Sequence, residues 1–298
     1  MKNELRSALI LFLTAAIWGF AMAFQREGSR YLSPFTFNAC RFTLGALALL
    51  PLMRRDSKKN RSPMTRRDAF LGAALGLVLV LASLLQQMAV GESGAGKAGF
   101  LTALYVVLVP VLGELIGKKT RLFTWLALIL AVPALYLLCV PAEEIFTLAA
   151  SDLMLILGSV VWALHILFTD HFVRTVRPLK LCAMQFACGA AVNWAFALIF
   201  EAISPENLMR ALIPVMYCGL LSTGVGYLCQ TIGQRGCRPA FAALILSLES
   251  VFCVIAGALM LGERMEARGY IGCALMLLAV VLAQAGDLLV PAKEESHV

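Results

Sequence analysis

The chain has 298 residues, of which 60% are hydrophobic and only 14% are charged. Soluble domains carry about 25% charged residues, so this composition excludes an ordinary water-soluble globular protein. The net charge is +7 at pH 7, and the basic residues gather in short segments between apolar runs, the densest at 54–67. Such segments suit the anionic surface of a membrane. We therefore expect the lipid bilayer as a partner, and no nucleic acid.

Ten apolar runs follow one another along the chain. A helix needs about twenty apolar residues to cross a hydrocarbon core of about 30 Å, and lipid offers no partners for open backbone groups, so each run is predicted to be a helix. The predicted spans are residues 7–24, 33–53, 69–90, 95–116, 122–140, 153–172, 181–200, 211–230, 240–261 and 270–285. The first run also fits a cleaved signal peptide, with Lys2 and Arg6 before it. We favour a span because nine more follow, which predicts one all-α, polytopic bundle of ten transmembrane helices.

The lysines and arginines are distributed unevenly between the two sides of this bundle. With the N-terminus inside, the inner segments hold 18 of the 25 basic residues and the outer segments hold six, while Arg41 lies within a span. Basic residues are retained on the cytoplasmic side of membrane proteins. The sequence thus predicts a multi-pass protein of the cytoplasmic membrane with both termini in the cytoplasm.

The second half of the chain resembles the first. A shift of 144 residues places Trp18 on Trp162 and Phe42 on Phe186. The same shift pairs Pro34 with Pro178, Arg41 with Gln185, Gly45 with Gly189 and Ala46 with Ala190, and further along the best shift becomes 140, which pairs Leu104 with Leu244 and Leu108 with Leu248. Five spans separate the copies, and an odd number inverts the second copy in the membrane, as in many secondary transporters. We predict two inverted five-helix repeats, residues 1–145 and 146–298.

Polar and aromatic residues recur at helical spacing on one face of several spans. Thr14, Trp18, Ala21 and Gln25 in the first span share their offsets with Gly158, Trp162, His165 and Thr169 in the sixth. An inverted repeat brings such faces together near the middle of the membrane. The predicted cavity residues are Trp18, Gln86, Gln87, Thr102, Tyr105, Trp162, His165, Tyr227, Gln230 and Glu249. The alternative is that these groups only join helices by hydrogen bonds.

Glu249 lies about ten residues into the apolar run 240–261. An ionisable side chain at this depth costs about 3 kcal/mol to insert. One interpretation is that Glu249 binds a cationic group or carries a coupled proton, with His165 as a companion in a proton relay. The other is a structural ion pair, for which Arg41 is the deeply placed cation, with His165 an ordinary core residue.

Nine cysteines lie in or beside the apolar spans and form no CxxC motif. We interpret them as small packing residues. The sequence also contains no HExxH motif and no phosphate-binding loop. We therefore expect no metal, no cofactor and no catalytic residue, although an intramembrane enzyme built from the histidine, the buried glutamate and the cysteines stays as an alternative.

Together these motifs resemble the EamA family of the drug/metabolite transporter superfamily over residues 7–287. The resemblance rests on Trp18-Gly19, Arg41, the stretch from Gly99-Phe100-Leu101-Thr102 to Pro110, Trp162-Ala163-Leu164-His165, Ala243 to Glu249, and Leu261-Gly262-Glu263-Arg264. Ser250 stands where relatives usually have proline after the glutamate, which puts a proline kink there in question. Gly117-Lys118-Lys119 replaces the usual loop after the fourth span.

The resemblance implies export of small metabolites, amino acids or drugs by alternating access through a central cavity lined by both halves. We expect a secondary transporter with a small-molecule substrate and a coupled proton or cation. The alternatives are a non-transporting scaffold or lipid-binding bundle and, less favoured, the intramembrane enzyme. The sequence specifies neither the substrate nor the oligomeric state.

Overall fold

The computed structural model describes residues 2–60, 63–90, 92, 95–140, 149–261 and 266–289, and these ranges contain helices and no strand. The helices are α1 (Lys2–Gly28), α2 (Pro34–Asn60), α3 (Arg66–Ala89), α4 (Ala95–Ala103), α5 (Tyr105–Leu115), α6 (Leu122–Cys139), α7 (Ala150–Phe172), α8 (Pro178–Phe200), α9 (Pro205–Arg210), α10 (Leu212–Met216), η1 (Tyr217–Gly226), α11 (Tyr227–Gln234), α12 (Pro239–Leu246), α13 (Glu249–Leu261) and α14 (Ala267–Leu289). Within the described ranges, nine helical segments are long and apolar enough to cross a membrane, and Leu122–Leu138 is a tenth, shorter apolar helix. The polytopic all-α fold is confirmed.

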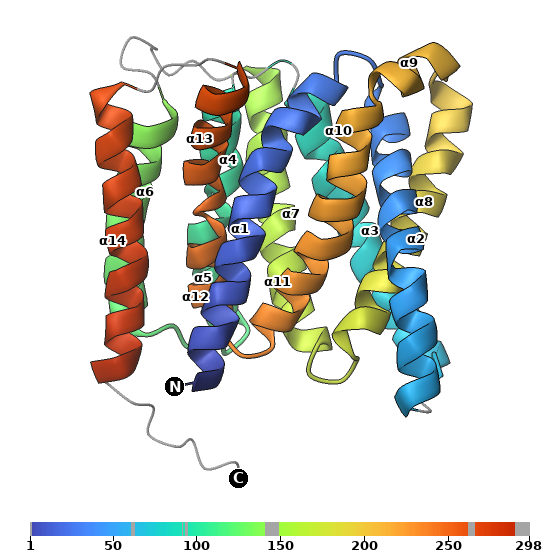
Figure 1. The fold of residues 1–298 in the computed structure, drawn as a ribbon. Coiled ribbons are helices and arrows are strands. Elements are labelled where there is room, and N and C mark those ends of the chain that lie inside the picture. Colours follow the sequence, from blue (N-terminus) through green and yellow to red (C-terminus); the bar gives the residue numbers. More distant parts are fainter. Residues whose placement is uncertain are drawn as a thin grey trace.

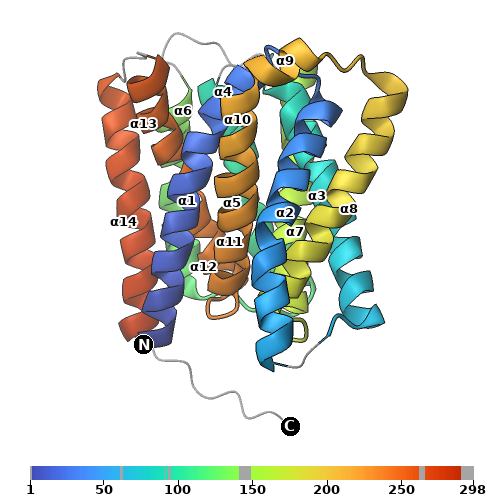
Figure 2. The same cartoon turned by 45° about the vertical axis from the view of Figure 1, so that its right-hand side comes forward.

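The helices pack in pairs that are equivalent in the two repeats. α1 and α7 run in opposite directions through the bundle (Figure 1). α1 packs against α13 and against η1 and α11, whereas α7 packs against α4 and α5 and against α3. Two further contacts, α2 with α8 and α6 with α14, join equivalent helices directly. Figure 2 shows α6 and α14 at one edge of the bundle and α2 and α8 toward the other. The first helix of each repeat thus packs against the third and fourth membrane-crossing segments of the other repeat. An inverted repeat produces this arrangement.

Two membrane-crossing segments are broken near their middle, where the sequence predicts continuous spans. Leu104 separates α4 from α5, and Ser247 and Leu248 separate α12 from α13. At both breaks the backbone forms i to i−3 hydrogen bonds, from Leu104 N to Leu101 O at 3.4 Å and from Leu248 N to Ile245 O at 3.1 Å. The Ser247 hydroxyl also donates to Leu244 O at 2.7 Å, which competes with regular helical bonding.

The positions of the breaks correct two expectations from the sequence. The second break forms beside Glu249 although Ser250, and no proline, follows it, whereas helix α5 continues through Pro110. The second halves α5 and α13 begin at Tyr105 and Glu249. These two residues are 144 positions apart, so the repeat keeps its original shift here and the alternative shift of 140 is wrong at this point.

Glycine permits the tightest helix contact beside the second break. A Cβ atom on Gly19 of α1 would lie 2.3 Å from Phe252 Cβ and 2.6 Å from Glu249 O. Such distances are far below van der Waals contact, so α1 can approach the start of α13 only because residue 19 has no side chain. The close contact fixes the position of Glu249 relative to α1.

The two ends of the bundle are distinguished by charge. The start of α1 and the end of α14 lie at the same end, which we name the basal face (Figure 1). Around the sides, large apolar residues such as Leu9, Leu198 and Leu259 are exposed, as expected for contact with lipid. At the basal face, Lys180 pairs with Asp68 at 2.9 Å and Arg177 with Asp56 at 2.7 Å. These ion pairs join α8 and the turn before it to α2 and α3.

Candidate functional site

A cavity of about 40 Å³ lies between the two repeats, next to both helix breaks. It is lined by nine of the residues singled out from the sequence, namely Trp18, Arg41, Gln86, Thr102, Tyr105, Trp162, Tyr227, Gln230 and Glu249. Gln25 and Ala21, from the predicted stripe of α1, also line it. Sequence reasoning missed Met22, Ile166 and Ser222, because apolar and small side chains within a membrane helix give no signal that separates a cavity wall from ordinary packing.

Two tryptophans form equivalent walls of this central cavity. The indole of Trp162 donates to Gln86 Oε1 at 3.0 Å, and the indole of Trp18 donates to Ser222 O at 3.1 Å. Each tryptophan therefore bonds to the third membrane-crossing segment of the other repeat. The Tyr227 ring lies 4.8 Å from the Trp18 ring and 6.3 Å from the Trp162 ring, between centroids. Hydrogen bonds and ring contacts hold a preformed aromatic surface.

One cation and one carboxylate face the cavity from different repeats. Arg41 is only 3% exposed, and its guanidinium donates to Gln25 Oε1 at 3.4 Å and lies 4.9 Å from the Phe42 ring centroid. Glu249 is in the first turn of α13, and its carboxylate lies beside the Tyr105 hydroxyl. Among the described residues no ion pair joins Arg41 to Glu249, so the structural pair considered from the sequence is not formed.

Several buried polar atoms of the cavity wall have no protein partner. In the described part of the chain, Arg41 Nε, Thr102 Oγ1 and both amide atoms of Gln230 make no hydrogen bond. Buried polar groups are nearly always satisfied in folded proteins, and the few exceptions point to water or a ligand. A volume of 40 Å³ admits only a few waters. The structure thus shows the cavity in a narrow state, with room for a few waters and for nothing larger.

Two residues predicted for the cavity do not line it. His165 is fully buried, with Nε2 3.2 Å from Gln185 Oε1, and its ring packs edge-on against Trp162. On α7 the cavity faces Trp162 and Ile166, which are four residues apart, so residue 165 points aside toward α8. Gln87 donates to Gln25 O at 3.4 Å and lines a separate pocket near residues 29–34, because it lies about 100° around α3 from Gln86.

The model of the EamA-like transporter family matches the chain twice, over residues 5–140 and 149–284. The chain belongs to the EamA-like transporter family. Its two matches correspond to the two structural repeats, so the protein is a multi-pass membrane transporter built from two EamA units.

Relatives of similar length carry names that describe transporters. An uncharacterized transporter of Archaeoglobus fulgidus is 26% identical over 281 residues, which cover 94% of this chain and 86% of the relative. The uncharacterized transporter YwfM of Bacillus subtilis is 24% identical over 100% of this chain and 99% of its own length. A crystal structure of another protein has a TM-score of 0.77 at 16% identity and covers 96% of this chain and 99% of the other. This last likeness supports the fold.

Proposed function

We propose that this EamA protein is a secondary transporter that exports small metabolites across the cytoplasmic membrane, through the central cavity between its repeats. Both termini are placed in the cytoplasm, as the basic residues predict. The observation that carries the proposal is the central cavity itself, which contains buried polar groups without partners between two broken helices of opposite repeats. Discontinuous helices at mid-membrane are typical of the substrate sites of secondary transporters.

The charges in the cavity favour a zwitterionic substrate with an apolar part. Arg41 offers a guanidinium that can bind a carboxylate in a forked geometry, and Glu249 offers an acceptor for an ammonium group. A substrate with both charges leaves neither side chain unpaired in a low-dielectric site. The rings of Trp18, Trp162 and Tyr227 supply apolar surface, so amino acids with aliphatic or aromatic side chains fit this chemistry.

The packing of the helices supports alternating access. Each repeat contributes one unbroken helix that carries a cavity tryptophan, α1 with Trp18 or α7 with Trp162, and one broken segment. Movement of one repeat against the other opens the cavity toward one side at a time. Glu249 is placed to couple this movement to a proton, because its carboxylate can bind either a proton or the ammonium group of the substrate.

A flux assay in liposomes tests the proposal. Purified protein is reconstituted into liposomes loaded in turn with zwitterionic amino acids, cationic drugs, monocarboxylates and neutral sugars, and efflux is followed with and without a pH gradient. We expect efflux of apolar amino acids to be faster than from loaded liposomes without the protein. The rate should rise further when protons can exchange for substrate. Absence of flux for all four classes would overturn the proposal.

A further inference from the structure

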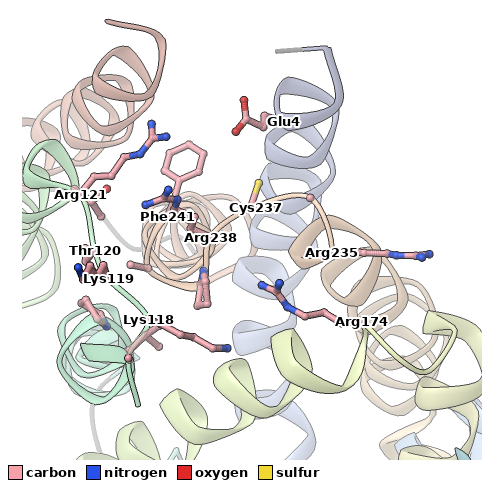
Figure 3. Close-up of a pocket in the computed structure, with 18 residues that line it drawn as sticks. Glu4, Lys118, Lys119, Thr120, Arg121, Arg174, Arg235, Cys237, Arg238 and Phe241 are labelled. Carbon is pink, nitrogen blue, oxygen red and sulfur yellow. The ribbon is translucent and has the colours of Figure 1, made fainter. Parts of the chain in front are cut away.

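A second, larger cavity of about 740 Å³ opens at the basal face. Its walls come from the start of α1, the end of α5, the α5–α6 loop, the residue two positions after α7, and the α11–α12 loop (Figure 3). We call it the basal cavity. Ligand pockets commonly have volumes of about 300–1,000 Å³, so this cavity is large enough for an organic anion or a lipid headgroup in the conformation that the structure shows.

The charges of the basal cavity are almost all positive. Its lining contains six basic side chains and one acidic side chain, Glu4. The basic residues are Lys118, Lys119, Arg121, Arg174, Arg235 and Arg238. They come from both repeats, so residues far apart in the sequence line one hollow, although the Arg235 side chain extends away from the other five in Figure 3.

Only part of this positive charge is neutralised by the protein. Asp170, whose side chain is 2% exposed, lies behind the cavity wall and pairs with Lys118 at 2.5 Å and with Arg174 at 3.4 Å. In Figure 3 the ends of Lys118 and Arg174 point toward one another across the hollow. Lys119, Arg235 and Arg238 form no ion pair with any other residue that the structure describes. The cavity therefore keeps a strong positive potential at its mouth.

Membrane topology alone does not account for this arrangement. Retention of basic residues on the cytoplasmic side requires lysine and arginine in the loops, and exposed positions satisfy that requirement, as Arg54, Arg55 and Lys58 do at the end of α2. It does not require loops of both repeats to place their basic residues around one concave space. Mutual repulsion in such a hollow is unfavourable unless an anion is bound there.

We propose that the basal cavity binds a phosphate-bearing anion, either a free phosphorylated compound or the headgroup of an anionic lipid. Phosphate carries more negative charge than a single carboxylate and accepts several forked hydrogen bonds from arginine. Basic pockets between membrane helices on the cytoplasmic side are suited to anionic headgroups. A single carboxylate, by contrast, leaves most of the charge of Lys119, Arg235 and Arg238 uncompensated.

The position of the basal cavity connects its ligand to the central cavity through helix α5. Tyr105, the first residue of α5, lines the central cavity, whereas Val109, Pro110 and Gly113 line the basal cavity. Helix α12, whose start lines the basal cavity, leads to the break before Glu249. An anion bound at the basal face thus contacts both broken segments at their basal ends.

Thermal unfolding with defined anions tests the proposal without any transport assay. The protein is placed in nanodiscs of phosphatidylcholine, and the unfolding midpoint is measured during titration with inorganic pyrophosphate, and separately in discs that contain phosphatidylglycerol. A ligand that binds the folded state raises the midpoint. A rise with pyrophosphate identifies a free anion as the ligand, and a rise with phosphatidylglycerol alone identifies the lipid headgroup.

Two matched variants show whether the cavity is the site. In the variant Lys119→Gln, Arg174→Gln, Arg238→Gln we expect the apparent affinity to fall at least about ten-fold. The control variant Arg54→Gln, Arg55→Gln, Lys58→Gln loses the same charge from the same face and keeps the shift. If the cavity variant does not fold, the single variants Arg174→Gln and Arg238→Gln should each weaken binding about three-fold. No midpoint rise with either anion, or equal rises in the wild type and the cavity variants, would overturn the proposal.

Discussion

The central and basal cavities differ in size, charge and exposure. The central cavity has about 40 Å³ and contains one guanidinium and one carboxylate among buried aromatic rings. The basal cavity has about 740 Å³ and contains six basic side chains and one acidic side chain, most of them exposed to solvent. In the first, opposite charges are balanced and held apart; in the second, like charges are gathered.

This difference suggests different roles for the two cavities: discrimination between substrates in the central cavity and attraction of anions in the basal cavity. A small site shielded from water makes each unpaired polar atom costly, so under the proposed function we expect the central cavity to distinguish substrates by where their charges lie. A wide, exposed basic hollow acts over a longer range and discriminates little between anions of similar charge. We therefore expect changes in the central cavity to affect transport strongly and changes in the basal cavity to affect mainly anion binding.

The largest effect is expected from Glu249→Gln, which removes the carboxylate of the central cavity. Loss of a buried charged partner costs about 2–5 kcal/mol, so transport in the liposome assay should fall about 100-fold or more. The unfolding midpoint should not fall, because a neutral amide is easier to bury. Glu206→Gln, at a site whose side chain is 72% exposed, is the matched control. Transport by Glu249→Gln at the wild-type rate would remove the central cavity from the mechanism.

The next largest effect is expected from Gly19→Ala, at the close contact between α1 and α13. The added methyl group overlaps Phe252 and the backbone of Glu249, and overpacking of this kind costs about 1–3 kcal/mol. Gly158→Ala in α7 is the control, because its Cβ would have no neighbour closer than 3.6 Å. Thermal unfolding in detergent should show a lower midpoint for Gly19→Ala alone. Equal midpoints would mean that α1 and α13 are less closely packed than described.

A smaller loss of stability is expected from Trp162→Phe, which leaves Gln86 Oε1 without its donor. An unsatisfied buried acceptor costs about 1–3 kcal/mol, here toward the low end because the cavity admits water. The double variant Trp162→Phe, Gln86→Leu should recover most of that stability, since both polar partners are then removed. Additive losses in the double variant would argue against the hydrogen bond between these two side chains.

The smallest effect concerns salt. Exposed charges are screened over about 10 Å at 0.1 M ionic strength and about 3 Å at 1 M, whereas buried charges are screened much less. Raising the salt concentration over this range should weaken pyrophosphate binding at the basal cavity several-fold and change substrate binding at the central cavity by less than about two-fold. Equal salt sensitivity at the two cavities would contradict the distinction between them.

The fold and most of the central cavity could be predicted from the sequence because both depend on strong periodic signals. Apolar runs of membrane length are unambiguous, and a charge such as Glu249 inside one is too costly to be accidental. His165 and Gln87 were predicted to line the cavity but lie outside it, because the residues of one helical stripe cover a wider arc than the part of the helix that faces a cavity. Helical spacing identifies a face about 100° wide, and packing decides which residue on that face reaches the cavity.

The helix breaks and the basal cavity could not be predicted for a different reason. No proline or glycine marks the breaks at Leu104 and at Ser247; they arise from local hydrogen bonding and from packing between repeats. The basic residues of the basal cavity were each explained by membrane topology. Their convergence depends on three loops meeting in space, which the order of residues along the chain does not show.

The central claim is that the two repeats move against one another around the central cavity. Spin labels at cysteines introduced at Lys58 and Arg235 of the basal face, and at Arg30 and Glu206 of the opposite face, report one distance between the repeats on each side once the native cysteines are replaced. With the amino-acid substrate identified by the flux assay, we expect one distance to increase and the other to decrease. If both distances stay unchanged while substrate is transported, or both change in the same sense, alternating access between the repeats is contradicted.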